Sequence, residues 1–494
     1  MRLKILGPPG TGKTTKALEY VEAFHNDPLI ERIVFCSFTL KAKNEAKERM
    51  QAVGFPLRSK HCPDAKIELA TIHSLAFNHM SYKRDYMVNT LASFARSIGQ
   101  KSTIVNDRYT QAAKTPLEKA IAYYQILRSR MMNHDLVHMP VGVGVQTIEG
   151  YISEFEKWKE AAQKIDYNDV LLNYLKRGEA FPHDIALVDE AQDLSPLQWA
   201  CVDKMFANAK KYITIGDDDQ TIFGFAGTRA LDFIQWPCDE TETLKKSHRL
   251  GKDIQEYSQH VLKRLTVRLP KVFAPREGPS SVRFTNGIEP VSDIFPYKSC
   301  AILHRNAYIA TKIRKTLDSM GLIYKGKNSP FSQAKRLKAI RLWEEWRAGE
   351  QLYGKHLHAI MQFVPKEANI SRYEDLGRKA MAPPCPYPTV PWQNILEMPE
   401  REVYENVQDL QSLAYLLSEP VIEITTIHQS KGGEWDKIIL MTDVSAATYG
   451  QFQKGTDEER DEEHRCWYVA LTRARIDLQI VRPQTMKFYP LEGF

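Results

Sequence analysis

The sequence lacks the features of disulfide-stabilised, zinc-binding and membrane-spanning proteins. Its seven cysteines among 494 residues are scattered, and no two are spaced as a CxxC pair. Single thiols of this kind fit a reducing compartment, and they give neither a disulfide framework nor the spacing of a zinc site. No stretch approaches the ~18 consecutive apolar residues of a membrane helix, and the N-terminus has no signal-peptide core or cleavage site. We therefore expect a cytoplasmic protein.

An excess of charge of either sign is also absent. The 67 Lys and Arg face 61 Asp and Glu, which leaves a formal charge of +6. The 43% hydrophobic and 26% charged content is ordinary for a globular protein. At roughly 100–200 residues per domain, the length predicts about three or four domains. A mild charge permits a nucleic-acid partner without indicating one, because a basic surface can be local. We expect the acidic run 457–463 to be the solvated start of a helix.

A glycine-rich loop between a short apolar strand and a helix is the first chemical signal. The strand is expected at 2–6 and the helix at 15–24, and the loop between them, GPPGTGKT, fits GxxxxGK[ST]. Its glycines let backbone N–H groups curl around phosphates at a helix N-terminus. We expect Lys13 to reach the β and γ phosphates and the Thr14 hydroxyl to ligate Mg²⁺. The pattern predicts a nucleoside triphosphatase.

Two further expected strands end in acidic and amide side chains. An apolar run at 185–188 is followed at once by Asp189 and Glu190. A carboxylate at a strand end can hold Mg²⁺ and its neighbour can orient or deprotonate water, so we assign Asp189 to the metal and Glu190 to the water. A second run, 212–215, leads into GDDDQ, where Gln220 is the candidate sensor of the γ-phosphate.

Two aromatic residues, Phe223 and Phe225, follow that acidic loop at a spacing of two. On an extended segment such residues project to the same side. The pair predicts either a stacking platform for bases or two core side chains, and the sequence leaves both readings open.

Nine segments, in order along the chain, resemble the motifs of superfamily 1 helicases of the UvrD/Rep/PcrA type. They are GPPGTGKT at 7–14, FCSFT at 35–39, ATIHSL at 70–75, DEAQD at 189–193, GDDDQTIFGF at 216–225, LKKSHRL at 244–250, AILHRN at 301–306, ITTIHQSKGGEWD at 424–436 and WYVALTRAR at 467–475. The series, rather than any one motif, carries the resemblance.

The resemblance implies an α/β fold of two RecA-like P-loop NTPase domains with parallel sheets, each carrying an inserted subdomain. The implied parts are motor domain 1A at 1–75 and 166–240, a helical insertion 1B at 76–165, motor domain 2A at 241–327 and 418–494, and a small insertion 2B at 328–417. From 76 to 140, nine Lys and Arg against four Asp and Glu favour contacts between this insertion and phosphates.

The resemblance also implies roles for individual residues. Arg249 and Arg473 match the arginines that contact the γ-phosphate, and Glu434 the residue near the nucleotide sugar. His248 replaces the tyrosine that stacks on adenine, so we propose it as the base platform. The residues expected to hold ATP and Mg²⁺ are Gly7, Gly10, Thr11, Gly12, Lys13, Thr14, Thr15 and Asp189. Those expected to line the DNA track are Phe38, Thr39, His73, Phe223, Phe225 and His428.

Some family features are missing or changed. The glutamine that reads adenine upstream of the P-loop has no counterpart among the six residues before Gly7. Ala226 stands where the family has an arginine, and Gly433 replaces a leucine. Selectivity for ATP over other nucleotides therefore follows less directly from the sequence than hydrolysis does.

The implied function is ATP-dependent 3′→5′ translocation on single-stranded DNA with unwinding at single-strand/duplex junctions, by a monomer that does not engage a membrane. It would serve replication, repair or recombination. The sequence does not decide which pathway the protein serves, whether it needs a protein partner, or whether it prefers DNA or RNA. One alternative is a translocase that remodels protein–nucleic acid complexes without efficient unwinding. Another is a nucleotide-gated subunit of a larger complex.

Overall fold

The computed structural model describes residues 1–37, 40–59, 61–87, 91–102, 113–133, 139–140, 142–288, 296–368, 370, 373 and 375–492. The chain forms two compact units. The first comprises Met1–Pro279 and Gly450–Thr472, and the second comprises Ser280–Tyr449 and Arg473–Phe494. Within the described residues, no helix combines the length and apolar composition needed to cross a bilayer.

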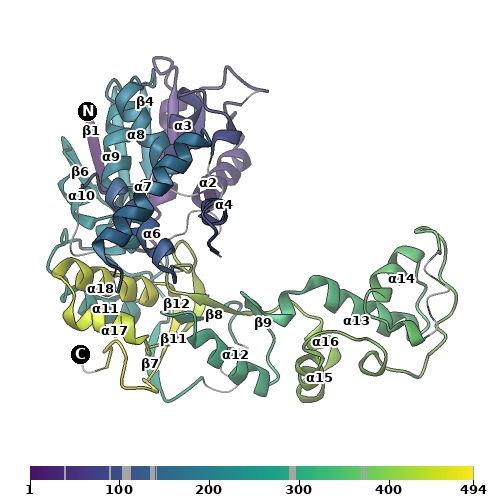
Figure 1. Ribbon diagram of the computed structural model, residues 1–494. Coiled ribbons are helices and arrows are strands. Elements are labelled where there is room, and N and C mark those ends of the chain that lie inside the picture. The colour runs from purple at the N-terminus through teal and green to yellow at the C-terminus, as the bar shows by residue number, and fades with distance from the viewer. Residues whose placement is uncertain are drawn as a thin grey trace. The chain divides into compact units, whose positions relative to one another are not determined.

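The first unit is built on a six-stranded parallel sheet (Figure 1). Its strand order is β3-β2-β4-β5-β1-β6, so β5 lies between β1 and β4. Because all the pairings are parallel, the loops that follow these three strands emerge at one edge of the sheet. The bounds are β1 Arg2–Leu6, β2 Ile33–Ser37, β3 Ile67–Thr71, β4 Ile185–Asp189, β5 Lys211–Gly216 and β6 Glu240–Thr243.

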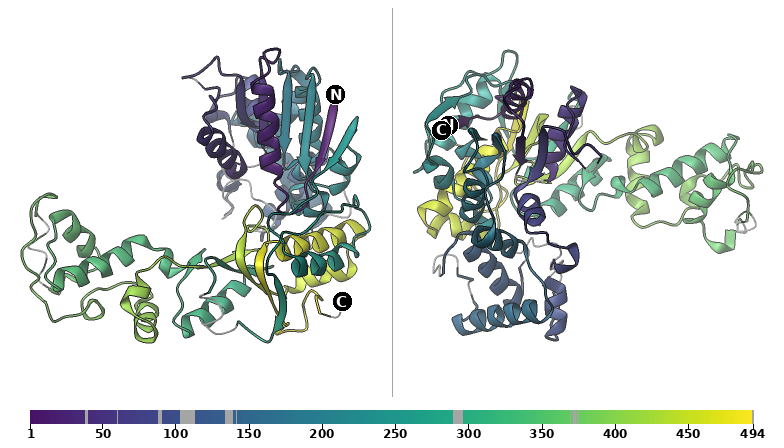
Figure 2. Two further views of the ribbon diagram at one scale, coloured as in Figure 1. Left: turned by 180° about the vertical axis from the view of Figure 1, so that it is seen from behind. Right: turned by 90° about the horizontal axis from the view of Figure 1, so that it is seen from above.

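Helices cover both faces of this sheet because its strands are apolar on both sides. Ile33 and Phe35 of β2 pack with α1 (Lys13–His25) and α2 (Leu40–Ala52), whereas Val34 and Cys36 pack against the opposite set of helices. That set is α3 (Ile72–His79), α8 (Tyr167–Arg177) and α9 (Pro196–Met205). The two sets are visible in front of and behind the sheet in Figures 1 and 2. The alternation follows the two-residue period of a strand.

The remaining helices of the first unit extend or flank this core. Helices α4 (Leu91–Ser97), α6 (Pro116–Ser129) and α7 (Val145–Ala161) belong to the helical insertion between β3 and β4, and α10 (Ala230–Gln235), α11 (Lys252–Leu262) and α18 (Asp457–Leu471) follow later in the chain. Single turns of 3₁₀ helix occur at Arg84–Tyr86, Ala191–Asp193, Asp218–Gln220 and Gly224–Ala226.

The first turn of helix α18 is exposed as expected, at Asp457 and Glu458, but the end of the acidic run is buried. Asp461 and Glu463 are 2% and 7% exposed. Asp461 accepts hydrogen bonds from the backbone N–H groups of Thr266 and Val267, and Glu463 accepts one from the Trp467 indole. An acidic run can therefore be buried where backbone and indole donors satisfy it.

The second unit repeats the architecture with the order β7-β12-β11-β8-β10-β9, again entirely parallel. Its strands are β7 Ser281–Thr285, β8 Cys300–His304, β9 Tyr324–Gly326, β10 Ile422–Thr426, β11 Trp435–Met441 and β12 Ala474–Val481. Its helices are α12 Ile309–Ser319, α13 Ala334–Arg347, α14 Gly354–Met361, α15 Arg401–Leu410 and α16 Leu413–Leu416, and α17 Ala446–Lys454 spans a boundary between the units. Helices α13 to α16 lie between β9 and β10 in the chain and bury Trp343, Trp346 and Trp392.

The two parallel sheets confirm the expected fold class of two RecA-like α/β domains, each interrupted by an insertion. The compact units divide the chain differently from the motif-based parts, because 241–279 and 450–472 pack with the first sheet. Strand β6 pairs with β1, and α18 packs on α11. The finer division into 1A, 1B, 2A and 2B stays a prediction.

Candidate nucleotide and DNA sites

The P-loop leaves β1 and enters α1 through two glycines in the left-handed region, Gly10 at φ +71° and Gly12 at φ +81°. The Gly7 N–H donates to the Gly216 carbonyl at 2.8 Å, which joins the loop to the end of β5. The Lys13 ammonium donates to the Gly7 carbonyl at 2.9 Å. The lysine therefore already lies over the loop that is expected to hold the phosphates.

The expected metal corner is formed by Thr14 and Asp189. The Thr14 hydroxyl donates to Asp189 Oδ2 at 3.3 Å, and Asp189 is 3% exposed. Burial and the neighbouring Glu190 raise the pKa of Asp189 to about 7, against the opposing charge of Lys13. A hydroxyl and a buried carboxylate are ligands that Mg²⁺ prefers, and a divalent cation would offset the carboxylate charge that burial disfavours. The donor set therefore fits Mg²⁺.

Glu190 lies beside this corner in a left-handed backbone conformation, at φ +52°. Such a conformation is costly for a residue other than glycine and is often retained at functional sites. The Glu190 N–H donates to Asp189 Oδ1 at 2.9 Å, and Glu190 Oε2 accepts from Gln192 Nε2 at 2.6 Å. The half-buried carboxylate is thus held in one orientation, as a group that accepts a proton from water must be.

Gln192 is a positioning residue that the sequence interpretation did not single out. Its Oε1 accepts from the Asp217 N–H at 2.9 Å while its Nε2 holds Glu190, so one fully buried amide links the ends of β4 and β5. A Cβ at Gly216 would come within 2.4 Å of Gln192 Oε1. The signal available in the sequence was a polar residue next to two carboxylates at a strand end.

Gln220, the candidate γ-phosphate sensor, follows β5 in the turn Asp218–Gln220. It is 5% exposed, and its Nε2 donates to Asp217 Oδ2 at 2.6 Å. Since β5 lies between β1 and β4, the P-loop, the paired carboxylates and Gln220 share one edge of the sheet.

The segment that contains His248 and Arg249 packs directly on the P-loop. The Ser247 hydroxyl donates to the Pro9 carbonyl and the His248 N–H donates to the Gly10 carbonyl, both at 2.8 Å. A Cβ at Gly10 would come within 2.4 Å of Arg249 Cβ, so this close approach requires glycine. Arg249 was expected on the second domain; the structure places it in the first unit, beside the phosphate loop. The His248 side chain is exposed there.

Arg473 and Glu434 belong to the second unit and lie just before β12 and β11, at the amino edge of its sheet. Arg473 is 1% exposed, and its Nη1 donates to the Gly433 carbonyl at 3.3 Å. Glu434 pairs with Arg475 at 3.2 Å. A Cβ at Gly433 would come within 2.5 Å of the Trp435 ring, so this glycine permits a close backbone approach.

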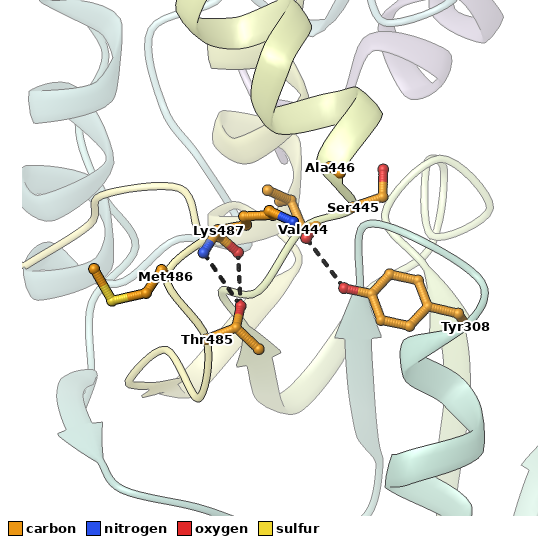
Figure 3. A pocket seen from close by; sticks show the side chains of 7 residues that line it. All are labelled: Tyr308, Val444, Ser445, Ala446, Thr485, Met486 and Lys487. Atoms are coloured by element: carbon orange, nitrogen blue, oxygen red, sulfur yellow. Dashed lines mark hydrogen bonds between the residues drawn. The ribbon is translucent and has the colours of Figure 1, made fainter.

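His428 lies at the opposite, carboxyl edge of the second sheet, directly after β10. An open pocket of about 370 Å³ lies at the same edge, after β8, β11 and β12 (Figure 3). Its lining residues are Tyr308, Val444, Ser445, Ala446, Thr485, Met486 and Lys487. The Tyr308 hydroxyl donates to the Val444 carbonyl at 3.1 Å. The motif pattern gave no indication of this pocket.

The other residues expected on the DNA track lie in the first unit. Phe38 and Thr39 lie outside the described residues. His73, at the start of α3, packs edge-on against Tyr167 at 5.4 Å between ring centroids, and burial lowers its pKa to about 4. It is therefore neutral at pH 7 and can stack or hydrogen-bond without a charge.

Phe223 and Phe225 are half-buried, with ring centroids 5.7 Å apart and planes at 85°. They form an edge-to-face pair, which leaves their faces pointing in different directions. The N–H of Gly224, between them, donates to Glu462 Oε1 on α18 at 2.8 Å.

Several of the described basic residues at 76–140 are engaged within the protein, and one of them, Arg96, donates to the Ala92 carbonyl at 3.2 Å. Arg128 donates to Asp166 and Asp169, and Arg130, 6% exposed, donates to Glu458 at 2.9 Å. These two side chains anchor the helical insertion to α8 and α18. Phosphate contacts from this region would have to come from its other basic residues.

The paired parallel sheets, the P-loop and the strand-end carboxylates define a P-loop NTPase with two RecA-like domains. Two family models match the chain: the UvrD/REP helicase N-terminal domain over residues 1–240 and the UvrD-like helicase C-terminal domain over 392–484. Together they match more than half of it. The chain belongs to the UvrD/Rep/PcrA-like helicases of superfamily 1.

Three helicases are similar to this chain at low sequence identity. F-box DNA helicase protein 1 of Schizosaccharomyces pombe is 24% identical over 99% of this chain and 56% of its own length. ATP-dependent DNA helicase srs2 of the same yeast is 26% identical over 52% of this chain and 33% of its own length. ATP-dependent DNA helicase UvrD2 of Mycobacterium tuberculosis H37Rv is 20% identical over 96% of this chain and 76% of its own length. The chain thus spans about half the length of the first relative and a third of the second.

Proposed function

We propose that this chain is an ATP-dependent DNA helicase that moves 3′→5′ along single-stranded DNA and separates strands at single-strand/duplex junctions. The observation that carries the proposal is the shared edge of β1, β4 and β5. There Lys13, Thr14, Asp189, Glu190 and Gln220 converge, and the Arg249 segment packs on the same loop. The family and the names of its relatives support the DNA substrate.

Hydrolysis follows from the roles of these side chains. The P-loop N–H groups bind the phosphates, and Lys13 moves from the Gly7 carbonyl to a phosphate oxygen. Mg²⁺, when held by Thr14 and Asp189, supplies positive charge to the phosphate oxygens. Glu190 accepts a proton from the attacking water, and Gln220 contacts the γ-phosphate. Arg249 and Arg473 stabilise the charge that develops on the transferred group.

Movement along DNA requires that the strand be gripped differently before and after hydrolysis. Phe223, Phe225, His73 and His428 supply aromatic faces for bases on both units, which is a sequence-tolerant mode of binding. The segments GDDDQTIFGF and TIHQSKGGEWD resemble those of the 3′→5′ branch and support the direction. We place the activity in replication, repair or recombination, in a monomer.

Replacing Glu190 by Gln tests the hydrolytic site. We expect Glu190→Gln to retain ATP binding and to lose ATP turnover by at least ~100-fold, because an amide cannot accept the proton. The measurements are DNA-stimulated phosphate release and equilibrium binding of a fluorescent ATP analogue. Glu22→Gln, an exposed carboxylate on α1, is the control and should behave as wild type. Unwinding by Glu190→Gln at the wild-type rate would refute the assignment.

The direction and substrate are tested by comparing 3′-tailed, 5′-tailed and blunt duplexes with DNA or RNA strands. The proposal requires unwinding of the 3′-tailed DNA duplex in preference to the others. Preference for a 5′ tail would overturn the direction, and preference for RNA would overturn the substrate.

A translocase that remodels protein–nucleic acid complexes is the second candidate. It is favoured by the compactness of the 328–417 insertion, where four short helices close over Trp343, Trp346 and Trp392. A streptavidin-displacement assay beside the fork assay separates the two candidates. Displacement of streptavidin without strand separation would favour this second function.

A further inference from the structure

A buried ion cluster lies directly behind Gln220. Lys271 Nζ lies 3.0 Å from Asp217 Oδ1 and 3.0 Å from Asp219 Oδ2, and it also pairs with Asp218. Its side chain is 2% exposed, and the three carboxylates are no more than 1% exposed. Arg268 pairs with both oxygens of Asp219, at 3.0 and 2.8 Å. Lys271 lies about 50 residues after the acidic loop in the chain, and no motif includes it.

Three adjacent buried carboxylates require cationic partners, since burial and mutual repulsion both oppose their ionisation. Burial raises the pKa of Asp217, but the charges of Lys271 and Lys13 outweigh it and hold that pKa below its usual value. Hydrogen bonds from Gln220 and Lys271 act in the same direction. Lys271 is therefore a main reason that Asp217 remains a carboxylate able to accept hydrogen bonds.

Asp217 in turn connects to both polar groups expected to act on ATP and water. Its Oδ2 accepts from Gln220 Nε2 at 2.6 Å. Its N–H donates to Gln192 Oε1 at 2.9 Å, and Gln192 holds Glu190 at 2.6 Å. The chain of contacts runs from Lys271 through Asp217 to the γ-phosphate sensor on one side and to the general base on the other.

We propose that Lys271 is a positioning residue for ATP hydrolysis, which fixes the Asp217 carboxylate and thereby orients Gln220 directly and Glu190 through Gln192. The inference rests on the proposed function, because it assumes that these two residues act on ATP and water. Lys271 itself touches no reacting atom. Its loss should reduce the rate of the chemical step and leave nucleotide affinity nearly unchanged.

The obvious variant, Lys271→Met, leaves buried carboxylates unpaired and can fail to fold. A charge-balanced variant, Lys271→Met with Asp218→Asn, removes one positive and one negative charge from the cluster. Asp218 is the suitable partner because it contacts Lys271 and the Leu269 N–H, whereas Asp217 holds Gln220 and Asp219 holds Arg268. Asp218→Asn alone is the matched control. Thermal unfolding confirms that each protein is folded.

The test is a mutant cycle with Gln220→Ala, scored by kcat and KM for ATP in the presence of DNA. Relative to Asp218→Asn, the charge-balanced variant should lose at least ~10-fold in kcat, with KM and binding of an ATP analogue changed less than about threefold. In the Gln220→Ala background, removal of Lys271 should cost clearly less kcat than in the wild-type background, since one of the two side chains it orients is gone and only the route through Gln192 to Glu190 remains.

Three results would overturn the proposal: an unchanged kcat, an equal loss of kcat in both backgrounds, or a rise in KM that accounts for the whole loss. An equal loss in both backgrounds would identify a general structural role for the cluster. The proposed function is tested separately by Glu190→Gln, whose loss of ATP turnover would support it whatever the Lys271 variants show. Failure of the Lys271 inference is therefore distinguishable from failure of the proposed function.

Discussion

Glu190 shows how much a single side chain depends on its backbone. Its positive φ turns the residue away from the line of β4, and Gln192, in the turn that follows the same strand, then holds the carboxylate. Asp189, one residue earlier, continues the strand and faces Thr14. Two adjacent carboxylates thus have different partners, Thr14 for Asp189 and Gln192 for Glu190, because the chain changes direction between them.

Buried histidines should make stability depend on pH. His304 is 3% exposed, and burial is the main cause that lowers its pKa from 6.5 to about 4. Between these values the unfolded chain binds a proton that the folded chain does not, so stability is full above pH 6.5 and falls as the pH drops toward 4. His464 behaves in the same way.

Replacing His304 by Tyr removes one of these titrations and should flatten the loss of stability between neutral and acidic pH. The measurement is the urea midpoint of unfolding at a series of pH values. His61→Tyr, at an exposed position, is the control, and its urea midpoint should change with pH as steeply as that of the wild-type protein. A His304→Tyr profile that falls as steeply as wild type would contradict the assignment.

At the scale of elements, α18 gathers contacts from several parts of the first unit. Its Asp461 binds the backbone of Thr266 and Val267, its Glu458 binds Arg130 of the helical insertion, and its Glu462 binds Gly224 between the two phenylalanines. The helix ends at Leu471, two residues before Arg473. One helix therefore joins the aromatic loop to the chain segment that carries an arginine expected at ATP.

Removing the carboxylate of Glu462 should loosen the aromatic loop while leaving the hydrolytic residues in place. A hydrogen bond to a charged group contributes about 1.5–3 kcal/mol. We expect Glu462→Ala to weaken binding of single-stranded DNA by about tenfold, with ATP turnover in the absence of DNA unchanged. Fluorescence anisotropy and DNA-free ATPase assays measure the two quantities.

Asp457→Ala, an exposed position in the first turn of the same helix, controls for loss of helix stability. Equal effects of the two substitutions on DNA binding would show that Glu462 has no specific role in the loop.

At the scale of the whole molecule, the local motifs were predictable and the contacts between distant segments were not. Lys13, Thr14, Asp189 and Gln220 could be placed because each needs only one strand and the loop that follows it. The partnership of Lys271 with Asp217 could not be predicted, since it depends on how the chain returns after α11. The same holds for the packing of Arg249 against Gly10, which places that arginine in the first unit.

The short connection between β10 and β11 has a mechanical consequence. Both strands are parallel members of one sheet, so residues 427–434 must return from its carboxyl edge, at His428, to its amino edge, at Glu434. No helix intervenes in this return. The connection is folded into turns, in which the Ser430 N–H donates to the Thr426 carbonyl at 3.0 Å and the Gly433 N–H to the Ser430 carbonyl at 2.9 Å, so few residues are available to absorb a displacement at either end.

The length of the connection at 427–434 should therefore matter more than its amino-acid composition. One glycine inserted after Gly432 would add slack without removing any side chain, and we expect DNA to lose its stimulation of ATP turnover while DNA-free turnover continues. Phosphate release with and without single-stranded DNA measures both, and an insertion after Gly349, an exposed turn beyond α13, is the control. On this prediction, the number of residues between His428 and Glu434 determines how closely the two edges of the second sheet are coupled.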